Sequence, residues 1–217
     1  MPVSPPSARR KSFALLLCAI FFLPASTRVS AATVPSAASQ TAVHNIGQIA
    51  VSPDGKRLAW IESGEVRVAP IGSVDKNQRI TAAHSPDGSC TESDPAWSPD
   101  SATLAFLSDC ADLGGQDDLY LSHLDGLPPQ RLTHLHGYVS APAFSPDGKR
   151  IAFLYVENAT RPAGALAAMD APSGVIGEDR IEIQRVAAVT VPEPQLSGPA
   201  FLTPEGLHVY EFDWSPD

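Results

Sequence analysis

The sequence lacks the short motifs that mark common catalytic and nucleotide-binding centres. It contains no Gly-x-Ser-x-Gly nucleophile elbow, no glycine-rich phosphate loop and no His-Glu-x-x-His pair. Cysteine is also scarce, and no second cysteine pair completes a structural zinc site around Cys90 and Cys110. We therefore assign no catalytic residue, no cofactor and no metal ligand from the sequence.

Basic residues are few. The chain has 15 Lys and Arg against 24 Asp and Glu, and four of the basic residues but none of the acidic ones precede Ala31. The part after residue 31 then carries 11 − 24 = −13 charges. This balance argues against nucleic acid or an anionic membrane surface as a partner. Many carboxylates fall in expected turns, which favours solubility and turn chemistry over an acidic binding face.

Long hydrophobic runs are missing except near the N-terminus. Basic residues are followed there by eleven apolar residues, Phe13–Leu23, and then by Pro24 and small residues up to Ala31. The run is too short to span a bilayer and has the order of a secretory signal, which predicts export to the periplasm or the medium. An uncleaved anchor is the alternative. After cleavage no membrane span would remain, and residues 32–45 are expected to form a linker or a closing strand for a distant blade.

One short pattern is repeated along the chain. A Ser-Pro-Asp anchor follows an apolar or aromatic residue four times, at Ser52, Pro53 and Asp54; Ser98, Pro99 and Asp100; Ser145, Pro146 and Asp147; and Ser215, Pro216 and Asp217. The first spacings, 98 − 52 = 46 and 145 − 98 = 47 residues, are near the length of a four-stranded propeller blade. The last gap, 215 − 145 = 70 residues, must contain an insertion.

The clearest repeat shows how the unit is expected to fold. Ser145 ends a short strand, Pro146 presets φ for a turn, and Gly148 can adopt a left-handed conformation at no steric cost. A second strand follows at Ile151–Val156, apolar on both faces, as expected between two neighbouring sheets.

A second sequence marker, a Gln-Arg pair, supports the same division of the chain into blades. Gln-Arg pairs lie between successive anchors, where the outermost strand of a blade is expected, at residues 78–81, 130–133 and 184–187. Third strands are expected at residues 65–69, 118–123 and roughly 166–170. The sequence therefore predicts an all-β fold, a partial β-propeller over residues 46–217. Its blades would cover about 46–91, 92–137 and 138–206, with the first strand of a fourth at 207–217.

An incomplete propeller leaves sheet faces uncovered. We therefore expect the chain to be a fragment of a longer product and, alone, to be poorly soluble or to self-associate.

Cys90 and Cys110 flank the first two strands of the second expected blade, which form a hairpin. Both cysteines therefore come to the same end of that hairpin, where a disulfide is geometrically reasonable. A disulfide and two free thiols both remain open from the sequence.

The repeats Ala96–Asp100 and Ala143–Leu154 resemble those of TolB-like proteins and of propellers in the prolyl oligopeptidase family of serine peptidases. Three further stretches, Gly137–Val139, Phe153–Thr160 and Tyr210–Asp217, look more like exported bacterial peptidases. The peptidase resemblance implies a propeller that gates access to an α/β-hydrolase domain and positions short peptides. It implies as partners the missing C-terminal blades, that hydrolase domain, which would carry the triad, and peptides.

The resemblance to TolB implies a different role, a periplasmic protein-binding module. A TolB-like propeller follows a small α/β domain, for which the stretch 32–45 is too short, so the peptidase hypothesis is favoured. Paired glutamates that grip a peptide amino group in some peptidases have no counterpart here.

Overall fold

The computed structural model describes residues 45–83, 90–159, 182–191 and 198–216. The expected signal peptide, nearly all of the linker, the strand expected at 166–170 and Asp217 lie outside these residues. Within them, all regular structure is β except for one short 3-10 turn, η1 (Val74–Lys76).

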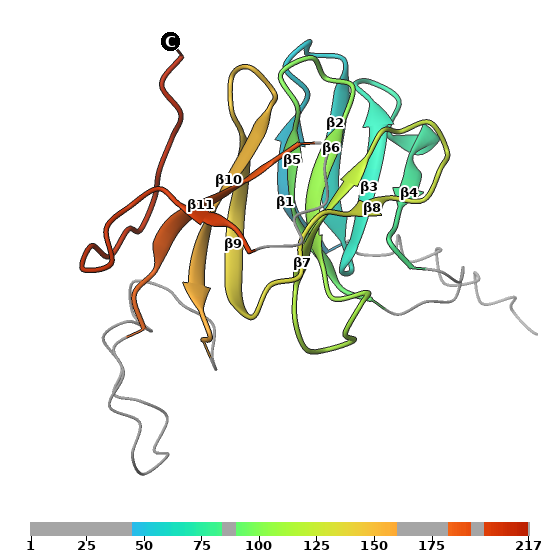
Figure 1. Ribbon diagram of the computed structural model, residues 1–217. Coiled ribbons are helices and arrows are strands. Elements are labelled where there is room, and N and C mark those ends of the chain that lie inside the picture. The colour runs from blue at the N-terminus through green and yellow to red at the C-terminus, as the bar shows by residue number, and fades with distance from the viewer. Residues whose placement is uncertain (1–44, 84–89, 160–181, 192–197, 217) are drawn as a thin grey trace, which may run out of the picture. The chain divides into compact units, whose positions relative to one another are not determined.

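The strands form three four-stranded antiparallel sheets, each in chain order (Figure 1). The first sheet contains β1 (Ile46–Val51), β2 (Arg57–Glu62), β3 (Glu65–Pro70) and β4 (Gln78–Ile80). The second contains β5 (Glu92–Trp97), β6 (Leu104–Ser108), β7 (Asp118–Ser122) and β8 (Gln130–Arg131). The third contains β9 (Gly137–Phe144), β10 (Arg150–Glu157), β11 (Arg185–Thr190) and β12 (Ala200–Phe201). Three successive meanders of this kind confirm the partial β-propeller.

Each of the first three anchors is a compact hydrogen-bonded turn between the first two strands of a sheet. In the first, the buried Ser52 hydroxyl donates to Asp54 Oδ1 at 2.6 Å and accepts from the Arg57 amide at 2.9 Å. The same two bonds measure 2.5 and 2.8 Å at Ser98, and 2.6 and 3.0 Å at Ser145. The repeated serine and aspartate therefore close the hairpin, and these hydroxyls are engaged in the turn.

The residue after the anchor aspartate takes a left-handed conformation. Gly148 does so at φ 69°, and Ser101 occupies the same place in the second turn at φ 62°. A side chain is strained there, but the Ser101 hydroxyl accepts the Asp54 amide at 3.0 Å. That bond joins the first turn to the second.

Side chains of the second strands alternate between the two neighbouring sheets. In β6, Leu104 and Phe106 pack against the first sheet, whereas Ala105 and Leu107 pack against the third. All of β6 is buried, as is the core of β10, which confirms the prediction that these strands are apolar on both faces.

The third sheet differs from the sequence prediction in its outer strands. Gln78–Thr81 and Gln130–Thr133 do supply the outermost strands β4 and β8, as predicted. The assignment of Gln184–Ala187 to an outermost strand was wrong, because β11 is the third strand and β12 lies outside it. The insertion expected in this blade falls before β11. The Gln-Arg pair, which marks the fourth strand of the first two sheets, therefore lies at the third strand of this sheet.

Two tryptophans make equivalent contacts with the preceding sheet: Trp97 of the second sheet with the first sheet, and Trp214 of the C-terminal segment with the third sheet. Trp97 Nε1 donates to the Ala50 carbonyl at 3.1 Å, and the Arg57 guanidinium lies 4.8 Å from its ring centroid. Trp214 Nε1 donates to the Ala143 carbonyl at 3.0 Å, with Arg150 5.0 Å from its ring.

The segment around Trp214 thus covers the far side of the third sheet, where Val209 and Phe212 pack against the buried cluster that contains Leu154 and Val186. It is not a strand within the described residues, since a strand requires a hydrogen-bonded neighbour in its own sheet.

We predict that Arg57→Ala lowers the free energy of unfolding by about 1–2 kcal/mol, because it removes the cation–π contact and the hydrogen bond to the Ser101 carbonyl. Urea denaturation would measure the loss. The neighbouring, exposed Lys56→Ala is the matched control. A loss no larger than that of the control would contradict a stabilising role for the Arg57 contacts.

Candidate functional site

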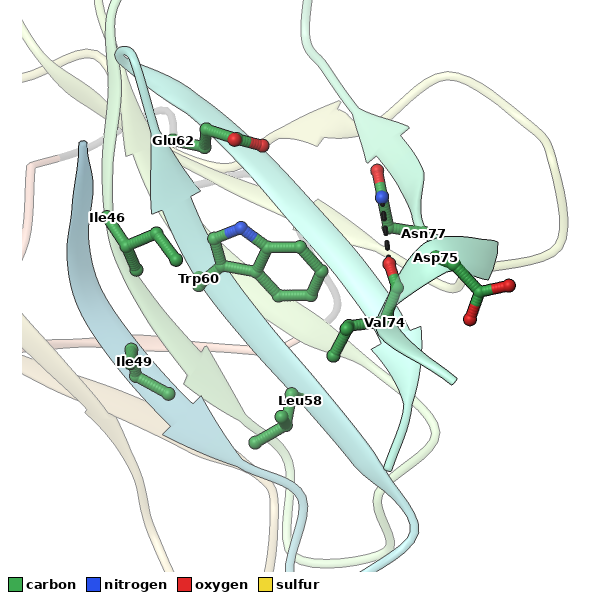
Figure 2. A pocket seen from close by; sticks show the side chains of 8 residues that line it. All are labelled: Ile46, Ile49, Leu58, Trp60, Glu62, Val74, Asp75 and Asn77. Carbon is green, nitrogen blue, oxygen red and sulfur yellow. Dashed lines mark hydrogen bonds between the residues drawn. The ribbon is translucent and has the colours of Figure 1, made fainter. Parts of the chain in front are cut away.

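An apolar groove of about 490 Å³ lies on the face of the first sheet that is turned away from the second sheet. Figure 2 shows the Trp60 indole at its centre, between Ile46 and Ile49 on one side and Val74 on the other. Ile49 is 64% exposed. The Trp60 indole nitrogen is buried and has no hydrogen-bond partner among the described residues.

The repeat explains this groove. Trp60 follows its anchor serine by eight residues, as Phe106 and Phe153 follow theirs, since 52 + 8 = 60, 98 + 8 = 106 and 145 + 8 = 153. Phe106 and Phe153 are fully buried against the preceding sheet. The groove is thus the surface that a preceding blade covers elsewhere in the chain.

A polar network connects the first strands of the three sheets. The Asp94 amide donates to Gln48 Oε1 at 2.8 Å, and Gln48 Nε2 donates to Asp94 Oδ1. Asp94 Oδ2 in turn accepts the Ala141 amide at 3.3 Å. Asp94 and Ala141 have positive φ values of 50° and 52°, at irregularities in the strand pairing. Each side chain therefore bonds to the backbone of the next sheet at the equivalent bulge.

Further acidic groups gather near Asp94. Burial raises the pKa of Asp117 to about 6, and Asp109, Asp94 and Asp118 add to this increase. Burial also raises the pKa of Tyr138, with added effects of Asp94 and Asp117.

A carboxyl group with a pKa near 6 can exchange a proton close to neutral pH. The described residues around Asp117 include no hydrogen-bonded serine–histidine or cysteine–histidine pair of the kind that activates a nucleophile.

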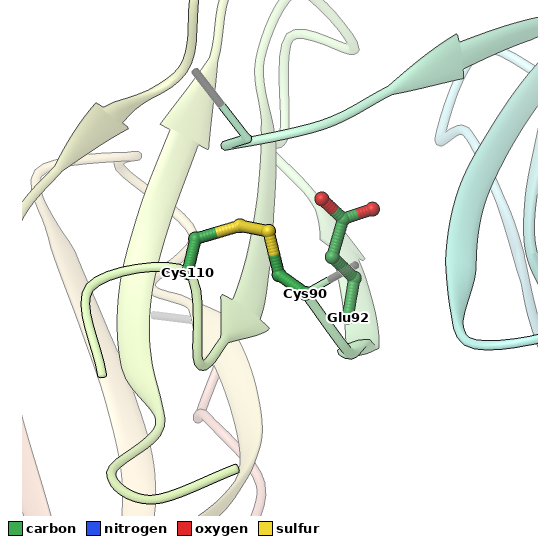
Figure 3. A group of neighbouring side chains, drawn as sticks. All are labelled: Cys90, Glu92 and Cys110. Atoms are coloured by element: carbon green, nitrogen blue, oxygen red, sulfur yellow. A yellow bond between two sulfur atoms is a disulfide. The ribbon is translucent and has the colours of Figure 1, made fainter. Parts of the chain in front are cut away.

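The cysteines form a disulfide, with Cα atoms 4.8 Å apart (Figure 3). Glu92 lies beside it and is 1% exposed. Its Oε2 and Oε1 accept the amides of Val66 and Ala82, each at 3.0 Å, which joins the second sheet to the first. Burial raises the pKa of Glu92.

Cys90, Glu92 and Cys110 have potential ligand atoms within 4.8 Å of one another. The two sulfurs are bonded to each other, and both carboxylate oxygens accept backbone amides. This group is therefore a structural clamp and does not offer thiolates to a metal.

The structure brings the predicted anchors to the turns between first and second strands. Ser215 and Pro216 are described without a strand before them. Sequence reasoning missed Gln48 and Asp94, although both lie four residues before an anchor serine, a register that could have identified them. Among the described residues, no helix is both long and apolar enough to cross a membrane.

No family model matches the chain. It is 32% identical over 115 residues to the uncharacterized peptidase YuxL of Bacillus subtilis, and 34% identical over 107 residues to a TolB homologue of Chlorobium luteolum. These matches cover 51% and 48% of this chain but only 17% and 22% of the relatives, so the chain spans less than a quarter of either. The predicted resemblance to a peptidase and to TolB is confirmed.

Similar solved structures include TolB of Acinetobacter baumannii, 23% identical with a TM-score of 0.46, covering 76% of this chain and 34% of that one. A puromycin-hydrolyzing peptidase of Mycobacterium tuberculosis is 20% identical with a TM-score of 0.49, covering 74% of this chain and 22% of that one.

We predict that Asp117→Asn stabilises the protein at neutral pH. The pKa of Asp117 is raised from 3.8 to about 6 in the folded state, so the folded state loses stability as the pH rises through this window. The gain should be about 1 kcal/mol at neutral pH, less than the whole shift would give because the carboxyl is partly exposed. Below about pH 4 it should vanish.

Thermal unfolding across this pH range would measure the effect, with the exposed Asp112→Asn of the same loop as control. An equal gain at low and neutral pH would show that burial of the Asp117 charge is not its cause.

We predict that Cys90 and Cys110 resist alkylation until a reductant is added, as read by peptide mass spectrometry. Because the bond joins residues 20 apart, reduction should lower stability by about 3 kcal/mol. The Cys90→Ser and Cys110→Ser double variant should match the reduced protein. Alkylation of both cysteines before reduction would refute the pairing.

Proposed function

We propose that this chain is the propeller segment of an exported serine peptidase of the prolyl oligopeptidase family. It would gate and position peptides for a hydrolase domain and be inactive alone. The observation that carries the proposal is the 32% identity to a peptidase over 115 residues. The repeat resemblance of the third unit to exported peptidases agrees with it, and residues 1–31 provide the export signal in this proposal.

The two outer sheets support a role within a larger ring. Trp60 lies on a face equivalent to those that bury Phe106 and Phe153. On the opposite side of the three sheets, Trp214 makes the contact with the third sheet that Trp97 makes with the first. Further blades of the same kind would cover both faces, since a blade buries its apolar faces only against neighbours.

The network of Gln48 and Asp94 supports the gating role. It lies on β1 and β5, and the first strands of successive sheets contact one another. The polar side chains and the Asp117 carboxyl lie near this edge, where peptide amides could find hydrogen-bond partners.

A periplasmic, TolB-like protein-binding module is the alternative. The 34% identity to a TolB homologue favours it. In that case the groove around Trp60, apolar at its centre with Glu62 and Asp75 at its border, would be a candidate contact for a protein partner.

We predict that the product of the gene, expressed with the sequence downstream of Asp217, reacts with a fluorophosphonate probe and hydrolyses short peptides. The 217-residue chain alone should do neither, because it has no nucleophile elbow. Deleting residues 46–217 from the complete product should keep the probe reaction and admit long peptides that the intact protein excludes.

The two parts of the proposal fail separately. The binding module would be favoured by two results together: the complete product is not labelled by the probe, and the immobilised chain retains an envelope protein. Labelling with an unchanged limit on peptide length would keep the peptidase assignment and reject the gate.

A further inference from the structure

A groove of about 420 Å³ lies between the anchor turns of the second and third sheets. Its lining includes the carboxylates of Asp100 and Asp147, the Phe144 ring, Thr103 and Gly148.

The corresponding place between the first and second sheets is filled by an arginine of the chain. The Arg57 guanidinium lies over the Trp97 ring at 4.8 Å, and its Nη2 donates to the Ser101 carbonyl. Beyond the third sheet, Arg150 lies over Trp214 at 5.0 Å. Two of the three equivalent borders therefore hold a guanidinium on an aromatic ring beside an anchor turn.

The repeat register shows why the middle border is different. Arg57, Thr103 and Arg150 each follow the anchor serine by five residues, since 52 + 5 = 57, 98 + 5 = 103 and 145 + 5 = 150. The ring one residue before the next anchor is tryptophan at the two arginine borders and Phe144 here. Without the guanidinium, the middle border keeps an aromatic face but leaves a hollow.

The middle border keeps a backbone carbonyl equivalent to the one that accepts the arginine hydrogen bond at the first border. Gly148 follows Ser145 by three residues, as Ser101 follows Ser98, so its carbonyl stands at the position that accepts Arg57 in the preceding turn.

Two carboxylates add negative charge to the groove. Asp100 Oδ1 accepts the Ser98 hydroxyl and the Ala102 amide, and Asp147 Oδ1 accepts the equivalent Ser145 and Lys149 groups. Oδ2 of either aspartate accepts no hydrogen bond from the described residues. The serine hydroxyls hold the pKa of both carboxyls below the usual value, so both are ionised at neutral pH.

We propose that this groove binds an arginine side chain of a polypeptide partner. The guanidinium would lie over Phe144, donate to the Gly148 carbonyl and be balanced by Asp100 and Asp147, which reproduces in trans the arrangement of Arg57. A planar cation with several donors fits such a site better than an ammonium group does. The net charge of −9 favours a basic partner. The site depends on neither proposed function.

The test is a titration of the ¹⁵N-labelled chain with acetyl-Ala-Arg-Ala-amide, followed by the amide signals of Asp100, Thr103 and Gly148. Saturable shifts are expected with the arginine peptide. The lysine peptide should bind more weakly, and the uncharged citrulline peptide should give no saturable shift. Equal responses to arginine and lysine, equal responses to arginine and citrulline, or no saturable shift at these amides would each overturn the proposal.

Variants of the groove sharpen the test. Thr103→Arg combined with Phe144→Trp rebuilds the filled border and should abolish peptide binding. Asp100→Asn, at an exposed position, should weaken binding about two- to fivefold, the range for one exposed ion pair. Asp54→Asn is the matched control, because Arg57 already fills that border.

Retained affinity in the filled variant, or equal losses in Asp100→Asn and Asp54→Asn, would overturn the proposal. If the filled variant does not fold, the comparison of the two aspartate variants decides.

Discussion

The structure depends on the packing of one four-stranded sheet on the next. A single sheet of this kind has two apolar faces, and burying a side chain such as Phe106 or Phe153 contributes about 1.5–3 kcal/mol only when a neighbouring sheet excludes water from it. The second sheet is covered on both faces, which explains why β6 and β7 are buried along their whole length. The first sheet is covered on one face, and the groove around Trp60 is the consequence on the other.

Polar groups fix the relative position of these apolar layers. Dispersion and hydrophobic contacts are tolerant of sliding, whereas a buried hydrogen bond is not. The buried Glu92 accepts two amides of the first sheet. At a more exposed place, Asp94 bonds to Gln48 on one side and to Ala141 on the other. Such bonds set the register between sheets. Because the buried Glu92 carboxylate would be costly without its partners, its bonds also require that the first and second sheets form together.

The sequence predicted what is local and repeated. The anchor turns, the first and second strands and the all-β class follow from residues a few positions apart, where proline, glycine and the serine–aspartate pair act directly on the backbone. The outer strands of the third sheet were misplaced because a marker identifies its own strand but not how many strands precede it after an insertion. Asp94 and its partners were missed because their bonds join residues 46 or 47 apart, and the only sequence signal for them is their shared position four residues before an anchor serine.

The differences between repeats carry information that the shared residues do not. A scaffold position is similar in every unit because the same packing problem recurs, as with Leu58, Leu104 and Ile151. At the borders, two distant positions change together: arginine accompanies tryptophan, and threonine accompanies phenylalanine. Either change alone would leave a guanidinium above a weaker ring, or an indole without its cation. The paired change instead opens a hollow between the second and third sheets while their apolar layers remain complete, so the border can acquire a new contact at little cost to the fold.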